Sequence, residues 1–250
     1  CTKNYVKKIF KDSNNLFKVF CSEGNFVLSK KILISTGGHP SGHKLAKSLG
    51  HNIIKPLPSL FSFTCKTPGL TGCAGSSLKN VYLKIILNKK IFENNGDLLI
   101  THWGFSGPGI LKLSSLAARA LSFEKYNFKL VIGWSDLNPK ELREKIDYLR
   151  EKSGKLNLHN ARPIPLITHR LWIFLLNRIG INAEKKWADI YSHERDAIIK
   201  ILHKDVYQIN AKGPFGEEFV TAGGVDVDEV NFKTMESLLI KGLYFSGEIL

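Results

Sequence analysis

Apolar and polar positions follow two different periodicities along this 250-residue chain, one typical of strands and one typical of helices. Short apolar runs between turn residues predict strands near the start, from residue 59 to 135, and again near the end. Between residues 136 and 203, apolar positions recur at helical spacing instead. The expected strands are 5–10, 16–21, 26–28, 31–35, 60–64, 81–87, 91–93, 98–101, 129–134, 206–210, 217–222 and 243–246.

Capping residues locate the helices. Asn138-Pro139-Lys140-Glu141 combines an N-cap, a proline at the first helical position and a glutamate at the third, which predicts a capping box. A helix over 169–178 is expected to end before Gly180, and Ser192 is expected to cap another. Further helices are expected at 42–49 and 108–121, and residues 93–97 (Glu-Asn-Asn-Gly-Asp) are expected to form a turn.

The order of these elements predicts an α/β fold in which an insertion splits one domain. The first part of that domain is 1–56, and the second part is 222–250. The insertion contains a β-rich subdomain at 57–135, a helical subdomain at 136–203, and return strands of the β-rich part at 204–221.

Two strand ends carry residues suited to a nucleotide cofactor. The apolar strand 31–35 stops at Thr36-Gly37-Gly38, where missing side chains allow a diphosphate or sugar to approach the backbone. The strand 243–246 runs into Gly247-Glu248, and an acid at such a position accepts hydrogen bonds from sugar hydroxyls. Taken singly, these residues are better explained by a plain tight turn and a solvated glutamate.

Two other stretches are candidates for chemistry. Residues 101–109 place His102 among three glycines just before a helix, where an imidazole can act as a proton donor, although a structural turn is the alternative. Gly223 and Gly224 follow an expected strand and offer flat packing beside a conjugated ring, although the stretch by itself is typical of a strand and a loop. The sequence contains neither G-x-G-x-x-G nor a P-loop string, and no spacing typical of a metal site, so we expect no metal.

The composition sets limits on partners. The formal net charge is +14, but the lysines are scattered or paired rather than clustered, so a nucleic-acid partner is not expected from charge alone. No apolar run reaches the length that spans a bilayer, and the four cysteines fit free thiols in a reducing cytoplasm.

The four candidate stretches, in this order, resemble the bacterial conserved flavoproteins, also called the aminoacetone oxidase family or NAD(P)/FAD-dependent oxidoreductases. The strings that carry the resemblance are Thr-His-Trp-Gly-Phe-Ser-Gly-Pro at 101–108, Thr-Met-Glu-Ser at 234–237 and the Gly-Glu at 247–248, with others spread over the chain. The resemblance implies a Rossmann-like FAD-binding domain interrupted by a β-barrel-like and a helical subdomain.

The resemblance also implies residue roles. Thr36, Gly37 and Gly38 would line the nucleotide side of FAD, Gly223 and Gly224 would lie near the flavin, and Gly247-Glu248 near the pyrophosphate and ribityl chain. A two-electron transfer with NAD(P)H or a small organic substrate would follow. That family begins with a strand–G-x-G-x-x-G–helix unit which this sequence does not contain. A non-catalytic remnant, or a basic nucleic-acid-associated module, is therefore the alternative.

Overall fold

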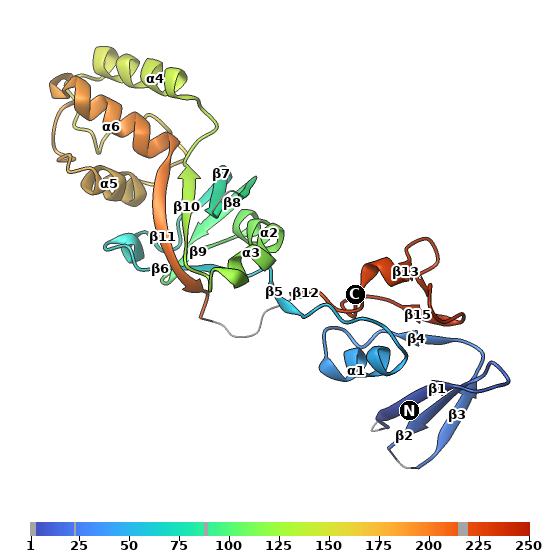
Figure 1. Cartoon of the computed structure of the whole chain (residues 1–250). Coiled ribbons are helices and arrows are strands. Elements are labelled where there is room, and N and C mark those ends of the chain that lie inside the picture. Colours follow the sequence, from blue (N-terminus) through green and yellow to red (C-terminus); the bar gives the residue numbers. More distant parts are fainter. Residues whose placement is uncertain (1–3, 23, 88–89, 215–219) are drawn as a thin grey trace. The chain divides into compact units, whose positions relative to one another are not determined.

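The computed structural model describes residues 4–22, 24–87, 90–214 and 220–250. The chain divides into two compact units, and Figure 1 shows their elements. One unit consists of residues 1–58 and 220–250, and we call it the nucleotide-side unit after the role that the resemblance predicts for it. The barrel unit consists of residues 59–219. Each unit is described by itself.

The barrel unit is built on a closed β-barrel. Its described strands are β6 (Phe63–Cys65), β7 (Ser77–Leu87), β8 (Lys90–Ile100), β9 (Gly104–Ser106), β10 (Phe128–Gly133) and β11 (Asp205–Lys212), ordered β10-β11-β6-β9-β8-β7. Every adjacent pair is antiparallel. Alternate side chains of β7, among them Val81, Leu83 and Ile85, are buried, because successive strand residues point to opposite faces.

Strand β8 corrects one prediction. The expected turn at 93–97 is instead strand, and Asn94 and Asn95 pair with Leu83 and Tyr82 of β7. A β-carbon added to Gly96 would lie 2.7 Å from the α-carbon of Gly109. The glycine that looked like a turn residue therefore permits close packing of a helix on the strand.

Helices cover the barrel and extend from it (Figure 1). The expected helix 108–121 is interrupted at Ala117, which separates α2 (Pro108–Leu116) from α3 (Ala118–Phe123). Three further helices, α4 (Pro139–Lys152), α5 (His169–Arg178) and α6 (Ser192–His203), follow where helical spacing predicted them, and short 3₁₀ turns occur at Leu70–Cys73 and Trp187–Asp189.

The predicted capping box at Asn138 is confirmed. The Asn138 side chain accepts from the Glu141 N–H, and the Glu141 carboxylate accepts from the Asn138 N–H at 2.7 Å. The cap predicted at Ser192 is wrong, because Ser192 is already helical. Tyr191 occupies the cap position, and its N–H donates to the Glu194 carboxylate at 2.8 Å. The strand expected at 60–64 begins only at Phe63, since Leu60 adopts a φ of 54°.

A buried ion pair ties α5 to the barrel. Arg178 contacts the Asp205 carboxylate, and its guanidinium lies 4.3 Å from the ring centre of Tyr207. The indole N–H of Trp134 donates to the other Asp205 oxygen at 3.0 Å. Burial raises the pKa of Asp205, and the charge of Arg178 opposes that rise.

The nucleotide-side unit is a mixed α/β structure. The strands β1 (Val6–Lys11), β2 (Phe17–Cys21) and β3 (Phe26–Ser29) form an antiparallel sheet, and β4 (Ile32–Ile34), β13 (Val230–Asn231), β14 (Glu236–Ser237) and β15 (Leu243–Phe245) form another. The remaining elements are α1 (Pro40–Ser48), a 3₁₀ turn at Val227–Glu229, and the paired strands β5 (Leu57–Ser59) and β12 (Val220–Ala222). Helix α1 was expected at 42–49.

The α/β class is therefore confirmed at the level of a mixed fold with a six-stranded barrel. The Rossmann-like character of the nucleotide-side unit and the five-part division stay predictions, and residues 217–219 of an expected strand lie outside the described residues. Across the described ranges, no helix combines the length and apolar character needed to cross a membrane.

The contact between Gly96 and Gly109 gives a test of barrel packing. Alanine at 109 favours helix formation by about 1 kcal/mol, but its β-carbon would lie 2.9 Å from a Leu83 methyl group and from the backbone at Gly96. We expect Gly109→Ala to lower the unfolding free energy by about 1–2 kcal/mol, since overpacking outweighs helix propensity. Denaturation followed by tryptophan fluorescence measures this, because all four tryptophans lie in the barrel unit.

Gly72→Ala is the matched control, because a β-carbon there meets no atom within 4 Å. Equal stability of the two variants would show that the close approach is not needed.

Candidate cofactor site

Two strands far apart in the sequence end side by side in the nucleotide-side unit. β15 pairs with β4 in parallel, with Leu243 opposite Ile32 and Phe245 opposite Ile34. The Ser246 N–H donates to the Ile34 carbonyl at 3.2 Å. Since parallel strands end at the same edge of a sheet, residues 36–38 and 246–248 leave that edge together.

The turn after β4 is narrow and has polar groups beside it. Gly37 has a φ of 63°, which favours glycine. A β-carbon on Gly38 would lie 2.9 Å from the Thr221 hydroxyl and 4.0 Å from a Glu248 carboxylate oxygen. The structure thus brings together Gly38 and Glu248, which sequence patterns singled out separately, and adds Thr221 to them.

The loop at Gly223 and Gly224 approaches other backbone segments of the same unit. The Gly224 N–H donates to the Ile54 carbonyl at 3.0 Å, and the Val225 N–H donates to the Ile249 carbonyl at 2.8 Å. A β-carbon on Gly223 would lie 2.8 Å from the Lys55 carbonyl oxygen, and one on Gly224 would overlap the Ile249 carbonyl. Internal packing by itself therefore requires both glycines.

Helix α1 follows the turn directly. The His39 side chain caps it by accepting from the Ser41 N–H at 3.2 Å. A β-carbon on Gly42 would overlap the Thr36 hydroxyl, so Thr36 packs closely on the first turn of α1. This contact fixes the direction in which the helix leaves the turn.

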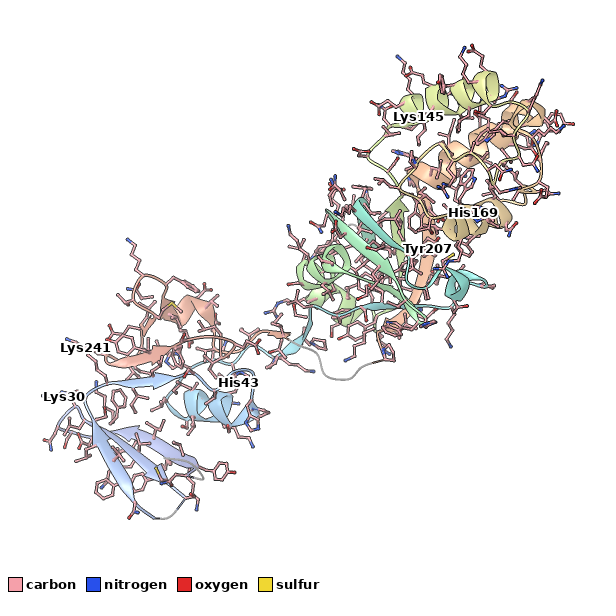
Figure 2. The ribbon with its side chains drawn as sticks, turned by 180° about the vertical axis from the view of Figure 1, so that it is seen from behind. Lys30, His43, Lys145, His169, Tyr207 and Lys241 are labelled. Atoms are coloured by element: carbon pink, nitrogen blue, oxygen red, sulfur yellow. The ribbon has the colours of Figure 1, made fainter. Side chains whose placement is uncertain are left out.

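Within the described residues of the nucleotide-side unit, two buried side-chain atoms have no hydrogen-bond partner. They are Nε2 of His43 on α1 and the Thr221 hydroxyl oxygen. Figure 2 shows His43 on α1. Burial lowers the pKa of His43, which favours the neutral imidazole. A buried polar atom without a partner is costly, so both atoms are candidates for hydrogen bonds to a bound molecule.

Another buried histidine is fully paired. His51 contacts the Glu229 carboxylate at 2.8 Å through Nδ1 and the Ser237 hydroxyl at 2.9 Å through Nε2. The Glu236 carboxylate accepts from the Gly242 N–H at 2.7 Å. These bonds account for His51 and for the Glu-Ser of the 234–237 string as structural residues that hold β14 and β15.

His102 lies in the barrel unit and not in this cluster. It follows Thr101 in a tight turn between β8 and β9, where the Thr101 N–H donates to the Gly104 carbonyl at 2.8 Å. The Gly104 N–H donates to the Thr101 hydroxyl at 3.1 Å. These bonds explain the threonine and the glycine by local structure, and a catalytic role of His102 stays a prediction.

Sequence reasoning missed Thr221 and His43. Thr221 belongs to a string that was noticed for its glycines, and His43 is one of several scattered histidines. Their significance lies in burial without a partner, which depends on contacts distant in sequence. No local pattern signals it.

The barrel and its helices match a known family. Residues 57–220 fit the domain described as the HI0933-like protein barrel and H2TH domain, and the chain belongs to this family.

The curated relatives include two proteins named ribosomal RNA dihydrouridine synthase. The one from Haemophilus influenzae is 30% identical over 234 residues, covering 88% of this chain and 54% of the relative. The one from Escherichia coli is 29% identical over 238 residues, covering 91% and 56%. The 3-dehydro-bile acid delta(4,6)-reductase of Clostridium scindens is 24% identical over 231 residues, covering 86% and 53%.

The chain thus spans about half the length of each of these relatives. Their names describe reduction chemistry and support a general flavoprotein oxidoreductase family. The aminoacetone oxidase activity implied by the resemblance stays a prediction.

The buried state of His43 predicts a pH dependence. Its folded pKa is lowered, so below about pH 6.5, the ordinary histidine pKa, the unfolded state binds more protons than the folded state. The nucleotide-side unit should therefore lose stability as the pH falls through this region. Hydrogen exchange of α1, corrected for intrinsic rates, should show weaker protection at pH 5.5 than at pH 7.5.

His43→Leu should flatten this dependence, and His193→Gln, at an exposed position of α6, should leave it unchanged. Equal pH dependence in wild type and His43→Leu would contradict the assignment.

Proposed function

We propose that this chain forms part of a flavin-dependent oxidoreductase that adds a hydride and a proton, two electrons and two protons in all, across a carbon–carbon double bond. FAD is the proposed cofactor and NAD(P)H the proposed reductant. The observation that carries the proposal is the meeting of residues 36–38, Thr221 and Glu248 at the end of a parallel strand pair. The names of the relatives support the reaction class, since dihydrouridine and the delta(4,6)-reduced bile acid both result from saturating such a bond.

The residues present fit a flavin nucleotide in three respects. The Gly37-Gly38 turn has no side chain to keep a diphosphate away from the backbone. The carboxylate of Glu248 lies beside that turn, where it accepts hydrogen bonds from ribityl or ribose hydroxyls. The buried Thr221 hydroxyl lacks a protein partner among the described residues and is free to pair with a ligand.

The mechanism divides between the cofactor and the protein. A bound flavin would supply the hydride chemistry, which no protein side chain provides. The chain's own residues would bind and orient it: the 36–38 turn holds the nucleotide end, Glu248 fixes the sugar chain, and Thr221 adds one directed hydrogen bond. The neutral imidazole of His43 is buried on α1 and would offer its Nε2 to the same ligand.

We further propose a uridine in RNA as the substrate. This differs from the expectation drawn from the scattered lysines, which disfavoured nucleic acid. Two relatives with 30% and 29% identity are named for ribosomal RNA, whereas the bile-acid relative is 24% identical. A net charge of +14 also suits a polyanionic substrate better than a small steroid acid.

Flavin content tests the cofactor. The chain, purified and denatured, should release FAD, identified by its absorption and fluorescence, or should take up added FAD when purified without it. A protein that contains no flavin and binds none would contradict the proposal for this chain.

The Thr221→Val variant tests the site with two readouts, the affinity for FAD and the stability of the flavin-free protein. Loss of the hydroxyl should raise the Kd for FAD about fivefold, which is the worth of about one hydrogen bond. The same change should leave the flavin-free protein as stable or slightly more stable, because it removes a buried polar atom that lacks a partner. FAD titration and hydrogen exchange of the nucleotide-side unit measure the two effects.

Thr71→Val, at an exposed position in the barrel unit, is the matched control. If Thr221→Val weakened the apoprotein and left FAD affinity at the control value, the hydroxyl would be structural.

A further inference from the structure

The barrel unit contains a groove where the barrel meets its helices. Two hollows, of about 300 Å³ and about 360 Å³, share the lining residues Asn80, Ser135, Asp136 and Leu137. We call the two together the junction groove. It lies within residues 78–203 and uses none of the candidate cofactor residues.

The first hollow combines cationic and apolar walls. Lys79 and Lys145 line it together with Pro165 and Leu166. Leu166 is 69% exposed although it is a large apolar residue. Neither lysine makes an ion pair with a described residue, so both ammonium groups are available to an anion. Figure 2 marks Lys145 on α4.

The second hollow is lined mostly by polar side chains. Asn95, Asn138 and His203 line it, together with Tyr82, whose hydroxyl donates to Glu93 at 2.8 Å. Asp136 lies in the part shared by the two hollows. Amides, an imidazole and a carboxylate offer both donors and acceptors, as needed to pair with the edge of a nucleobase.

The floor of the groove is rigid. Trp134 lines the first hollow, is only 2% exposed, and donates its indole N–H to Asp205. Asp205 is in turn held by Arg178, which lies over Tyr207. Because each of these groups is paired or packed, the groove is preformed and a ligand would not have to order it.

The charge of the unit selects the kind of ligand. The barrel unit contains 24 lysines and arginines against 15 aspartates and glutamates. A polyanion is therefore attracted. The apolar walls and the donors and acceptors for base edges further favour a polyanion that carries nucleobases over one that carries phosphates alone. We propose that the junction groove binds single-stranded RNA, with Lys79 and Lys145 at backbone phosphates, Leu166 against a base face, and the amides and Asp136 at base edges.

This inference rests on the proposed function, because it places part of an RNA substrate outside the cofactor site. Single-stranded rather than duplex RNA fits, since stacking on Leu166 and pairing at base edges both need unstacked bases. Duplex RNA and anionic membranes, which the positive charge would also attract, are alternatives that the test must separate.

Fluorescence anisotropy with the full chain and a labelled 12-nucleotide RNA of mixed sequence tests the groove. At about 0.1 M salt, the double variant Lys79→Ala/Lys145→Ala should raise the Kd about tenfold. The plot of log affinity against log salt concentration should become less steep by about 1.4, because each of the two lost phosphate contacts removes roughly 0.7 from the slope. The matched control is Lys112→Ala/Lys129→Ala, two exposed lysines outside the groove.

Leu166→Ala should raise the Kd about threefold to tenfold at every salt concentration, as expected when a base loses part of an apolar contact surface. Leu116→Ala, at a position on α2 that is 55% exposed, is its control. Equal affinities of groove and control variants would overturn the proposal. So would equal competition by duplex RNA, or by vesicles that contain one-quarter phosphatidylserine.

Failure of this inference and failure of the proposed function can be told apart. A chain that binds RNA through Lys79 and Lys145 but holds no flavin contradicts the proposed function and leaves the groove in place. A chain that holds FAD but whose RNA affinity is the same in groove and control variants contradicts only the groove.

Discussion

The antiparallel pairing of β6 with β11 is the constraint on which the rest of the structure depends. Phe63 lies opposite Lys212, so the points at which the chain enters and leaves the barrel unit are adjacent. β5 and β12, on the two sides of that insertion, then pair with each other. Closing the barrel therefore brings residues 58 and 220 together. This reduces the loop-closure entropy that the parallel pairing of β4 with β15 would otherwise cost.

The glycines of the candidate cofactor site fall into two groups, those that backbone packing requires and those that it does not, and the sequence alone does not distinguish them. Gly223 and Gly224 are required because backbone carbonyls at Lys55 and Ile249 fill the space of a side chain. Gly37 has free space where a β-carbon would lie, and its neighbour Gly38 meets only side-chain atoms of Thr221 and Glu248. The 36–38 turn is thus the part whose glycines are not explained by backbone packing.

Local signals predicted local features well. The capping box at Asn138, the helix 169–178 and the strand before Gly247 all depend on residues a few positions apart, and the structure has each of them. Predictions failed where a distant contact decided the outcome. Gly96 was assigned to a turn, but Gly109 of the packed helix explains it. Likewise, the unpaired state of His43 and Thr221 exists only once the fold has removed water from them.

The candidate site followed the same rule. Sequence patterns singled out Thr36, Gly38 and Glu248 as candidates, because strand ends with glycine and an acid are local signals. They gave no indication of the junction groove, whose walls come from β7, β8, the 133–138 segment, α4, the 163–166 segment and the end of α6. A surface assembled from six separate stretches has no signature in any one of them.

The two proposals place redox chemistry and RNA binding in different units, and this division has a physical rationale. Transfer of electrons to a substrate requires a site that limits competing reactions with water, and the proposed flavin-binding unit contains the buried His43, whose pKa is lowered by burial. Attraction of RNA requires the opposite: exposed cations whose field extends through solvent. Burial of Lys79 and Lys145 would prevent their electric field from extending through solvent. A flavin placed beside such exposed lysines would in turn be open to competing reactions. Separate units would allow one chain to satisfy both demands.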